Sequence, residues 1–129
     1  MPDLNMPRPT DAELEILKVL WRRGPSTVRE VFETFGETKS TGYTTVLKLM
    51  QIMAEKGLVV RDESERAHRY TTALAEDETQ RQLVGDLLRK AFDGSARKLV
   101  LQALSTKRAS AEELSEIRRM LDELERGEP

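Results

Sequence analysis

The stretch from Ser40 to Gly57, STGYTTVLKLMQIMAEKG, constrains the fold of this chain more than any other. Read as a helix, it carries an apolar stripe at i, i+3, i+4, i+7 spacing, made up of Tyr43, Val46, Leu47, Met50, Met53 and Ala54. The opposite face carries polar residues at the same spacing, namely Thr41, Thr44, Thr45 and Lys48. Because an apolar stripe must pack on other elements, the pattern predicts a helix with one buried and one exposed face.

The polar face of this helix is unusual because three of its residues are threonines. A β-branched residue loses side-chain freedom in a helix, so these threonines weaken it unless their hydroxyls serve a purpose. Hydroxyl groups and a lysine can bind phosphate oxygens, and the Thr methyl can contact a thymine methyl in the major groove. We therefore interpret the segment as a DNA recognition helix. The alternative is an ordinary amphipathic helix whose Thr residues act as caps.

Two further helices are predicted before this segment. Both begin with a T-x-x-E capping box and end at a glycine, and they span Thr10–Gly24 and Thr27–Gly36. Their aromatic residues fall on the apolar stripes, so we expect core packing rather than base stacking for Trp21, Phe32 and Phe35. The preceding segment, Met1–Pro9, has no periodicity and holds three prolines, which predicts a flexible arm with Arg8 near its end.

After Gly57 the apolar period changes from 3.6 to 2, which predicts a β-hairpin with strands at Leu58–Arg61 and Ala67–Thr72. An isolated hairpin is marginal in water, so we expect it to lie on the helices with Leu58, Val60 and Tyr70 facing inward. Its second half carries only basic charges, on Arg66, His68 and Arg69. Three helices followed by a hairpin is the order of a winged helix-turn-helix, in which the third helix enters the major groove and the hairpin reaches the flanking backbone.

Composition narrows the possible functions. Zero cysteines and one histidine, His68, leave no residues for a zinc site, a thiol nucleophile or a catalytic triad, so we expect no enzyme, metal or cofactor. The sequence has no apolar run of the roughly 20 residues that span a bilayer and no signal peptide, which predicts a cytoplasmic protein without membrane insertion. The net charge of −2 argues against nucleic-acid binding, but residues 39–72 hold six Lys and Arg against four Asp and Glu.

Four segments give the chain a recognisable likeness: TDAELEILKVLW, STVREVFETF, GYTTVLKLMQIMAEKGLV and AHRY. Together they resemble the penicillinase-repressor family, the BlaI/MecI-type transcriptional regulators, over nearly the whole chain. The most specific part is the pattern YTTV-x-KLM-xx-M-xx-KG. The resemblance implies a homodimeric repressor that binds a palindromic operator through its winged helix and dimerises through its C-terminal helices.

The resemblance places five residues where the family reads its operator: Thr41, Tyr43, Thr44, Thr45 and Lys48. Tyr43 also belongs to the apolar stripe, so we expect its ring to be half-buried. The local basic charge adds four further candidates for DNA contact, which are Lys39, Arg66, His68 and Arg69, and the N-terminal arm adds Arg8. For His68, packing or hydrogen bonding within the hairpin is the alternative.

The last 57 residues predict three short helices, at residues 75–92, at 95–104 and from Ser110 onward. The third has apolar residues at a/d spacing, which is typical of a seam between helices. Helices this short cannot bury an adequate core alone, so we expect a homodimer interface. Its candidate residues are Leu87, Leu88, Phe92, Leu99, Val100, Leu104, Leu114, Ile117, Leu121 and Leu124. The alternative is that these helices fold back on the winged helix.

The expected fold is therefore mainly α with a small β-hairpin: a winged helix-turn-helix at residues 1–72 and a three-helix dimerisation region at 73–129. We expect a dimeric repressor of β-lactam-resistance-type or related genes, bound to a double-stranded DNA operator that is an inverted repeat. The alternatives are a protein-interaction module and a small-molecule-sensing regulator. The resemblance also implies an inducing protease from a membrane sensor system; the family's Asn-Phe scissile pair falls at Gln102-Ala103 here, which argues against cleavage at that bond.

Overall fold

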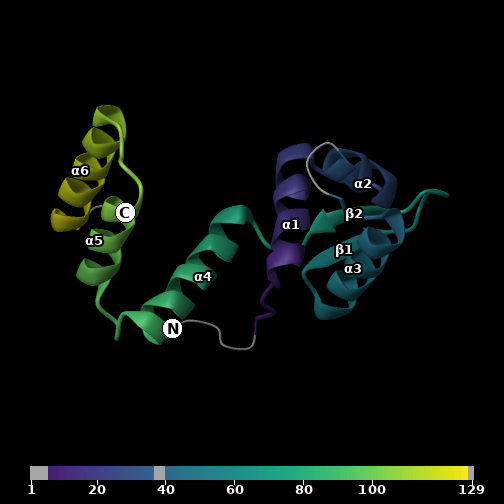
Figure 1. The fold of residues 1–129 in the computed structure, drawn as a ribbon, viewed down its shortest axis with the longest axis horizontal. Coiled ribbons are helices and arrows are strands. Elements are labelled where there is room, and N and C mark those ends of the chain that lie inside the picture. The colour runs from purple at the N-terminus through teal and green to yellow at the C-terminus, as the bar shows by residue number, and fades with distance from the viewer. Residues whose placement is uncertain (1–5, 37–39, 128–129) are drawn as a thin grey trace. The chain divides into compact units, whose positions relative to one another are not determined.

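The computed structural model describes residues 6–36 and 40–127. The elements follow in the order α1 (Asp11–Arg23), α2 (Val28–Gly36), α3 (Tyr43–Lys56), β1 (Val59–Asp62), β2 (Arg69–Thr72), α4 (Glu76–Ala91), α5 (Ala96–Thr106) and α6 (Ala111–Glu125) (Figure 1). The mainly α fold with a small hairpin is thus confirmed. Among the described helices, none has the length and apolar character needed to cross a membrane.

The chain divides into two compact units, Met1–Val84 and Gly85–Pro129, and the division falls inside α4. The sequence places the functional boundary earlier, after residue 72, and that assignment stays a prediction.

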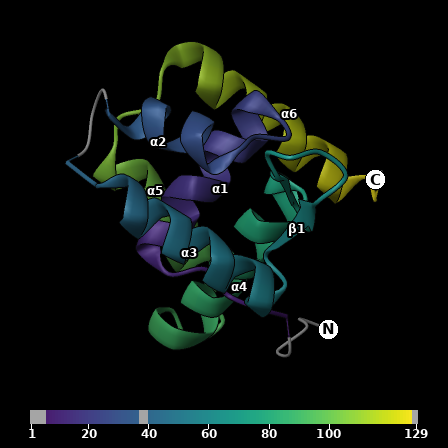
Figure 2. The ribbon, with the colours of Figure 1, turned by 90° about the vertical axis from the view of Figure 1, so that its right-hand side faces the viewer.

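The first unit is built around a core shared by α1, α2, α3 and the hairpin. The side chains buried completely, or to within a few per cent, include Ile16 and Leu17 of α1, Val31 of α2, and Val46, Met50 and Met53 of α3. The hairpin packs against α3 (Figure 2). Trp21 lies at the edge of this core, and its Nε1–H donates to the carbonyl of Leu74 at 3.0 Å. The apolar stripe predicted for α3 is therefore the stripe that the fold buries.

The helix starts follow the capping patterns of the sequence where a side-chain cap exists. Thr10 Oγ1 accepts from the Glu13 N–H at 3.2 Å, and Glu13 Oε1 accepts from the Thr10 N–H at 2.9 Å, which completes the expected capping box. α3 instead begins at Tyr43, after an extended Gly42 that supplies no side-chain cap. The prediction that the helix begins at Ser40 is therefore wrong, because the helix begins at Tyr43. Thr41 precedes the helix and does not lie on its polar face.

Of the three side chains expected to face inward from the hairpin, Leu58 and Tyr70 are buried and Val60 is not. β1 and β2 are antiparallel and pair Val59 with Thr72 and Arg61 with Tyr70. Val59 is buried, whereas Val60 is 59% exposed, so the inward assignment of Val60 is wrong. The N–H of Leu58 donates to the carbonyl of Met53 at 2.9 Å, so Leu58 is bonded to the last turn of α3 and lies outside the strand. β1 therefore begins at Val59, one residue later than predicted, and a one-residue shift changes which side chain faces the core.

The loop between α1 and α2 adds a third extended segment beside the hairpin. Ser26 and Tyr70 form an antiparallel bridge, in which the Ser26 N–H donates at 3.1 Å and the Tyr70 N–H donates at 2.8 Å. Ser26 is fully buried, and its hydroxyl donates to the carbonyl of Gly24 at 2.8 Å. These bonds fix the hairpin to the helical core at β2.

The segment before α1 is held in place by the first unit. The carbonyl of Pro7 accepts from Gln82 Nε2 at 3.0 Å, and the carbonyl of Arg8 accepts from Lys56 Nζ at 3.1 Å. The residues from Met6 to Pro9 are partly buried. The prediction of a flexible arm is therefore wrong for the described part of this segment.

The second unit leaves most of its apolar side chains uncovered. Among the described residues, neither α5 nor α6 has a buried side chain. Of the predicted interface residues, five are half-buried, namely Leu88, Phe92, Leu99, Leu114 and Ile117, and five are exposed, namely Leu87, Val100, Leu104, Leu121 and Leu124. The exposed fraction reaches 71% at Leu124. The helices of this unit do not form a closed core by themselves.

A partly buried ion pair joins the start of α1 to the end of α3. Glu13 is only 2% exposed, and its Oε1 lies 2.6 Å from Lys56 Nζ in the last turn of α3. Burial raises the pKa of Glu13, but the hydrogen bonds from Lys56 and from the Thr10 N–H outweigh it, so the pKa lies below its usual value. The pair therefore holds the start of α1 against the end of α3 at neutral pH.

Replacing Lys56 by Met is expected to lower the free energy of unfolding by about 2–3 kcal/mol, because the Glu13 carboxylate stays buried without its cation. Urea unfolding measures this loss. Lys18→Met is the matched control, since Lys18 forms an exposed pair with Glu15 at 2.9 Å and its loss should cost less than about 1 kcal/mol. Equal losses in the two variants would contradict the role given to Lys56.

The same carboxylate makes the stability of the fold depend on pH. Because folding lowers the pKa of Glu13, its ionised form stabilises the fold above the unfolded pKa, and this contribution is lost as pH falls through the folded pKa. Between about pH 6 and pH 3, the free energy of unfolding should therefore fall less steeply in Glu13→Gln than in the parent. Urea titrations at each pH test this, and parallel curves would contradict it.

Candidate nucleic-acid interface

The polar face of α3 is exposed, as the sequence predicts. Thr44, Thr45 and Lys48 are all exposed, and Lys48 forms no ion pair with a described residue. The buried Val46 and Met50 fix the opposite side of the same helix in the core. Two hydroxyls and one ammonium group thus lie side by side on a helix that cannot rotate without exposing its apolar stripe.

Tyr43 opens this helix and is held by residues of α2. The residue is 37% exposed, which is more than the half-buried ring that the sequence predicts, and its ring meets the ring of Phe32 edge-on at 5.7 Å between centroids. The guanidinium carbon of Arg29 lies 4.9 Å from the centroid of Tyr43 and 6.0 Å from that of Phe32. Sequence reasoning missed Arg29, although its i, i+3 spacing to Phe32 places both on one face of α2.

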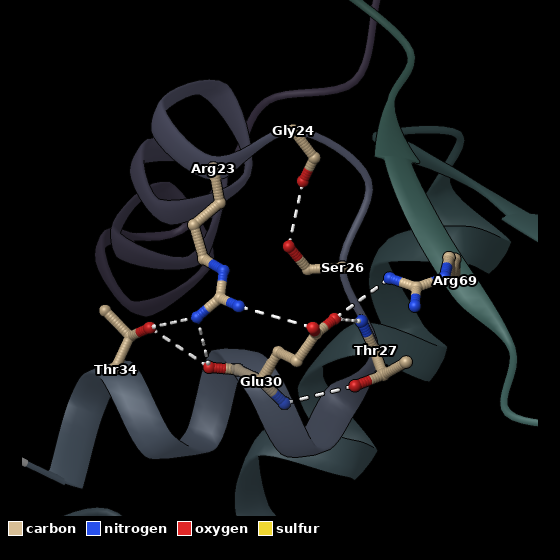
Figure 3. A network of polar contacts seen from close by, with 7 residues as sticks. All are labelled: Arg23, Gly24, Ser26, Thr27, Glu30, Thr34 and Arg69. Atoms are coloured by element: carbon tan, nitrogen blue, oxygen red, sulfur yellow. Dashed lines mark hydrogen bonds and ion pairs between the residues drawn. The ribbon is translucent and has the colours of Figure 1, made fainter.

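The basic residues of the wing divide into two groups. Arg66 and His68 lie in the loop that joins β1 to β2 and are exposed, and neither forms an ion pair with a described residue. Arg69 begins β2 and its Nη1 lies 3.1 Å from Glu30 Oε1 of α2 (Figure 3). The structure therefore leaves Arg66 and His68 on the surface, whereas it pairs Arg69 within the chain.

Glu30 connects three elements at this point. Its Oε1 accepts from the Thr27 N–H at 2.9 Å, and its Oε2 lies 3.3 Å from Arg23 Nη2 of α1 (Figure 3). The Thr27 N–H lowers the pKa of Glu30 most; burial opposes it, and Arg69 and Arg23 lower it further, so the pKa lies below its usual value. One carboxylate thus caps α2 and holds both α1 and β2 beside it.

A groove of about 420 Å³ lies between α3 and the wing. Its lining consists of Thr27, Val28, Arg29, Tyr43, Leu47, Gln51, Arg61, Arg66, Ala67, His68 and Tyr70. Among these described residues there are three arginines and a histidine but no carboxylate. A second hollow, beside the C-terminal half of α3, is lined instead by Glu55 and Glu63 together with Arg61. Positive charge is therefore concentrated beside the N-terminal half of α3.

Three of the predicted contact residues lie apart from this surface or outside the described residues. Arg8 is bound through its carbonyl to Lys56, at the far end of α3. From Thr44 to Lys56 an α-helix rises about 18 Å, so the structure does not bring Arg8 beside the threonines. Thr41 is half-buried and precedes the helix, and Lys39 lies outside the described residues.

In the ranges 6–36 and 40–127, no group of three or more metal-ligating side chains comes together.

Comparison with known proteins gives a consistent result. The family model described as penicillinase repressor matches residues 9–123. The chain is 37% identical over 118 residues to the transcriptional regulator BlaI of Mycobacterium tuberculosis, covering 91% of this chain and 85% of that protein. It is 25% identical to the penicillinase repressor of Bacillus licheniformis, with 92% of each chain covered.

Two solved structures share the fold. The solution structure of the DNA-binding domain of the repressor BlaI gives a TM-score of 0.51 at 26% identity and covers 60% of this chain and 93% of that one. The monomeric form of Bacillus licheniformis BlaI, solved in complex with the blaP half-operator, gives a TM-score of 0.50 at 26% identity and covers 57% and 89%. These similarities agree with a winged helix in this chain.

Replacing Glu30 by Ala is expected to lower the free energy of unfolding by about 1–2 kcal/mol, because α2 loses its capping box and two partly exposed ion pairs. A double-mutant cycle with Arg69→Ala should give a coupling energy of about 0.2–1 kcal/mol that shrinks with added salt. Arg81→Ala, which breaks only an exposed pair with Asp77, is the control. A coupling energy of zero at low salt would show that Glu30 does not hold the wing.

Proposed function

The chain belongs to the penicillinase repressor family, and on this premise we propose that it is a cytoplasmic transcriptional repressor that binds an inverted-repeat DNA operator as a homodimer. The observation that carries the proposal is the exposed face of Thr44, Thr45 and Lys48 on a helix whose opposite side is fixed in the core by fully buried residues. One structure with the same fold is a complex with a half-operator, which supports DNA as the ligand. The family is one of transcriptional regulators, and no catalytic role is proposed.

The dimensions of α3 suit the major groove. An α-helix with its side chains is about 10–12 Å wide, and the major groove of B-DNA is about 12 Å wide. With α3 in the groove, Thr44 and Thr45 would face base edges, and Lys48 would reach a phosphate. Arg66 and His68 in the wing would then lie near the flanking backbone. Roles on DNA for Thr41, Tyr43, Lys39, Arg69 and Arg8 belong to the same proposal.

The distribution of charge supports this docking despite the net charge of −2. Carboxylates within the first unit pair with Lys56, Arg61 and Arg69, whereas Lys48 and Arg66 pair with no described residue. Lys48 and Arg66 are therefore available to a ligand, and they lie on α3 and on the wing. A salt titration separates DNA binding from a protein-interaction role, because counterion release makes DNA affinity fall steeply with salt.

The proposal also includes a second copy of the chain, which would bury the exposed apolar side chains of the second unit. The a/d residues of α6 include Leu121 and Leu124, which are 53% and 71% exposed in the single chain. A symmetric dimer would bury these side chains against their counterparts. Two recognition helices related by a two-fold axis would then read half-sites about 34–36 Å, or a multiple of this, apart.

Release of DNA on induction belongs to the same proposal. The resemblance places the family's scissile pair at Gln102-Ala103, and both residues are exposed on α5. Their side chains differ from Asn-Phe, so the proposal includes no cleavage at this bond. The proposal includes a proteolytic partner from a membrane sensor. Measuring whether the neighbouring genes are induced in cells tests this partner and identifies the regulated genes.

Replacing Thr45 or Lys48 by Ala should weaken binding to a duplex selected by the protein from a random pool by about 1–3 kcal/mol, because each removes a direct contact. Lys48→Ala should weaken binding to random DNA as well, since a phosphate contact is independent of sequence. Fluorescence anisotropy measures both affinities, and thermal unfolding checks that the fold is unchanged. Parental affinity in both variants would show that this face does not read DNA.

Replacing Leu121 by Asp should convert the dimer to monomers, because the dimer would bury an unpaired charge in each copy at a cost of several kcal/mol. Operator affinity should fall with it, although no residue of α3 has changed. Analytical ultracentrifugation at micromolar concentration measures the oligomeric state, with Ser115→Asp as the control because Ser115 lies off the a/d seam. A monomeric parent, or a dimeric Leu121→Asp variant, would remove α6 from this role.

A further inference from the structure

The groove between α3 and the wing holds cations that the proposed base-reading residues do not account for. Arg29 reaches it from α2, and Arg66 and His68 reach it from the tip of the wing. Of its three arginines, Arg61 is the one with a carboxylate beside it, since its Nη2 lies 3.1 Å from Glu63 Oε2. Arg29 and Arg66 form no ion pair with a described residue, and no described carboxylate lines the groove. The groove is therefore an uncompensated positive site.

Arg29 is held in an orientation that leaves its hydrogen-bond donors available. Its guanidinium lies over the ring of Tyr43 at 4.9 Å, and Phe32 supports that ring edge-on at 5.7 Å. A cation–π contact does not require the N–H donors of the guanidinium, so the five donors of Arg29 remain available for a ligand. These donors have the fork geometry that suits the oxygens of a phosphate.

The position of the groove also fixes what can enter it on DNA. A helix about 10–12 Å wide fills a major groove about 12 Å wide, so a sugar-phosphate backbone must run along each flank of α3. The groove follows one flank, with Tyr43 and Leu47 of α3 on one side and the wing on the other. On the same flank, the hollow nearer the end of α3 contains Glu55 and Glu63 and would repel a phosphate.

We infer that this groove holds a backbone phosphate of the bound DNA, contacted by Arg29 from α2 and by Arg66 from the wing. The inference rests on the proposed DNA binding and adds to it a residue outside both the recognition helix and the hairpin. Arg29 thereby couples the backbone contact to Tyr43, the first residue of α3, because the same guanidinium touches both. Arg69, which the sequence suggests for the same kind of contact, pairs with Glu30 in the single chain and so also positions β2.

The test uses the full-length protein and two duplexes, one selected from a random pool and one of random sequence. Arg29→Gln and Arg66→Gln should each weaken binding to both duplexes by about fivefold at 0.15 M salt, and each should reduce the slope of log K against log salt by about one. Arg29→Lys should restore the slope because it retains the charge. Arg81→Gln removes an equal charge from α4, where Arg81 pairs with Asp77 at 2.7 Å, and should leave the slope unchanged.

Two results would overturn the inference while leaving DNA binding intact. One is an Arg29→Gln variant with the parental salt slope, and the other is a loss confined to the selected duplex, which would make Arg29 a support for Tyr43 and not a phosphate contact. Circular dichroism and urea unfolding establish that each variant is folded. A parent that binds neither duplex would instead refute the proposed function itself, so the two failures are distinguishable.

Discussion

The fixed position of α3 on α1 is the constraint on which the rest of the first unit depends. Val46, Met50 and Met53 bury one side of α3 completely, and the Lys56 ammonium meets the buried Glu13 carboxylate at the end of the helix. Apolar burial prevents rotation about the helix axis but tolerates small shifts along it. The ion pair is directional and limits these shifts along the axis. The exposed threonines of α3 therefore keep one position relative to the core.

Glu30 has the corresponding role for the wing. A hairpin of two four-residue strands is not stable alone, and here it is held by the Ser26–Tyr70 bridge and by the Arg69–Glu30 pair. Internal carboxylates also decide which cations remain available for a ligand. A chain with a net charge of −2 can therefore present a locally positive surface, because its acidic residues are paired or lie elsewhere.

The second unit shows a different balance. Its helices carry enough apolar residues for a core, but among the described residues α5 and α6 bury none of them. Exposed leucines at a/d spacing favour association because burying apolar surface is worth roughly 25 cal/mol per Å². The first unit thus contains the surface proposed to bind DNA, and the second contains the surface proposed to bring two copies together.

The sequence by itself determined the features that depend on neighbours along the chain. The capping boxes at Thr10 and Thr27, the buried stripe of α3 and the change of period after Gly57 arise from contacts a few residues apart, so pattern alone predicts them. Only the tertiary structure decided that Val59 and not Val60 faces inward, and that Arg69 pairs with Glu30, 39 residues away. It also placed Arg29 on Tyr43. These outcomes depend on where α2, α3 and the hairpin meet in space. Contacts between residues far apart along the chain produce no periodic pattern in the sequence, so the sequence alone does not predict them.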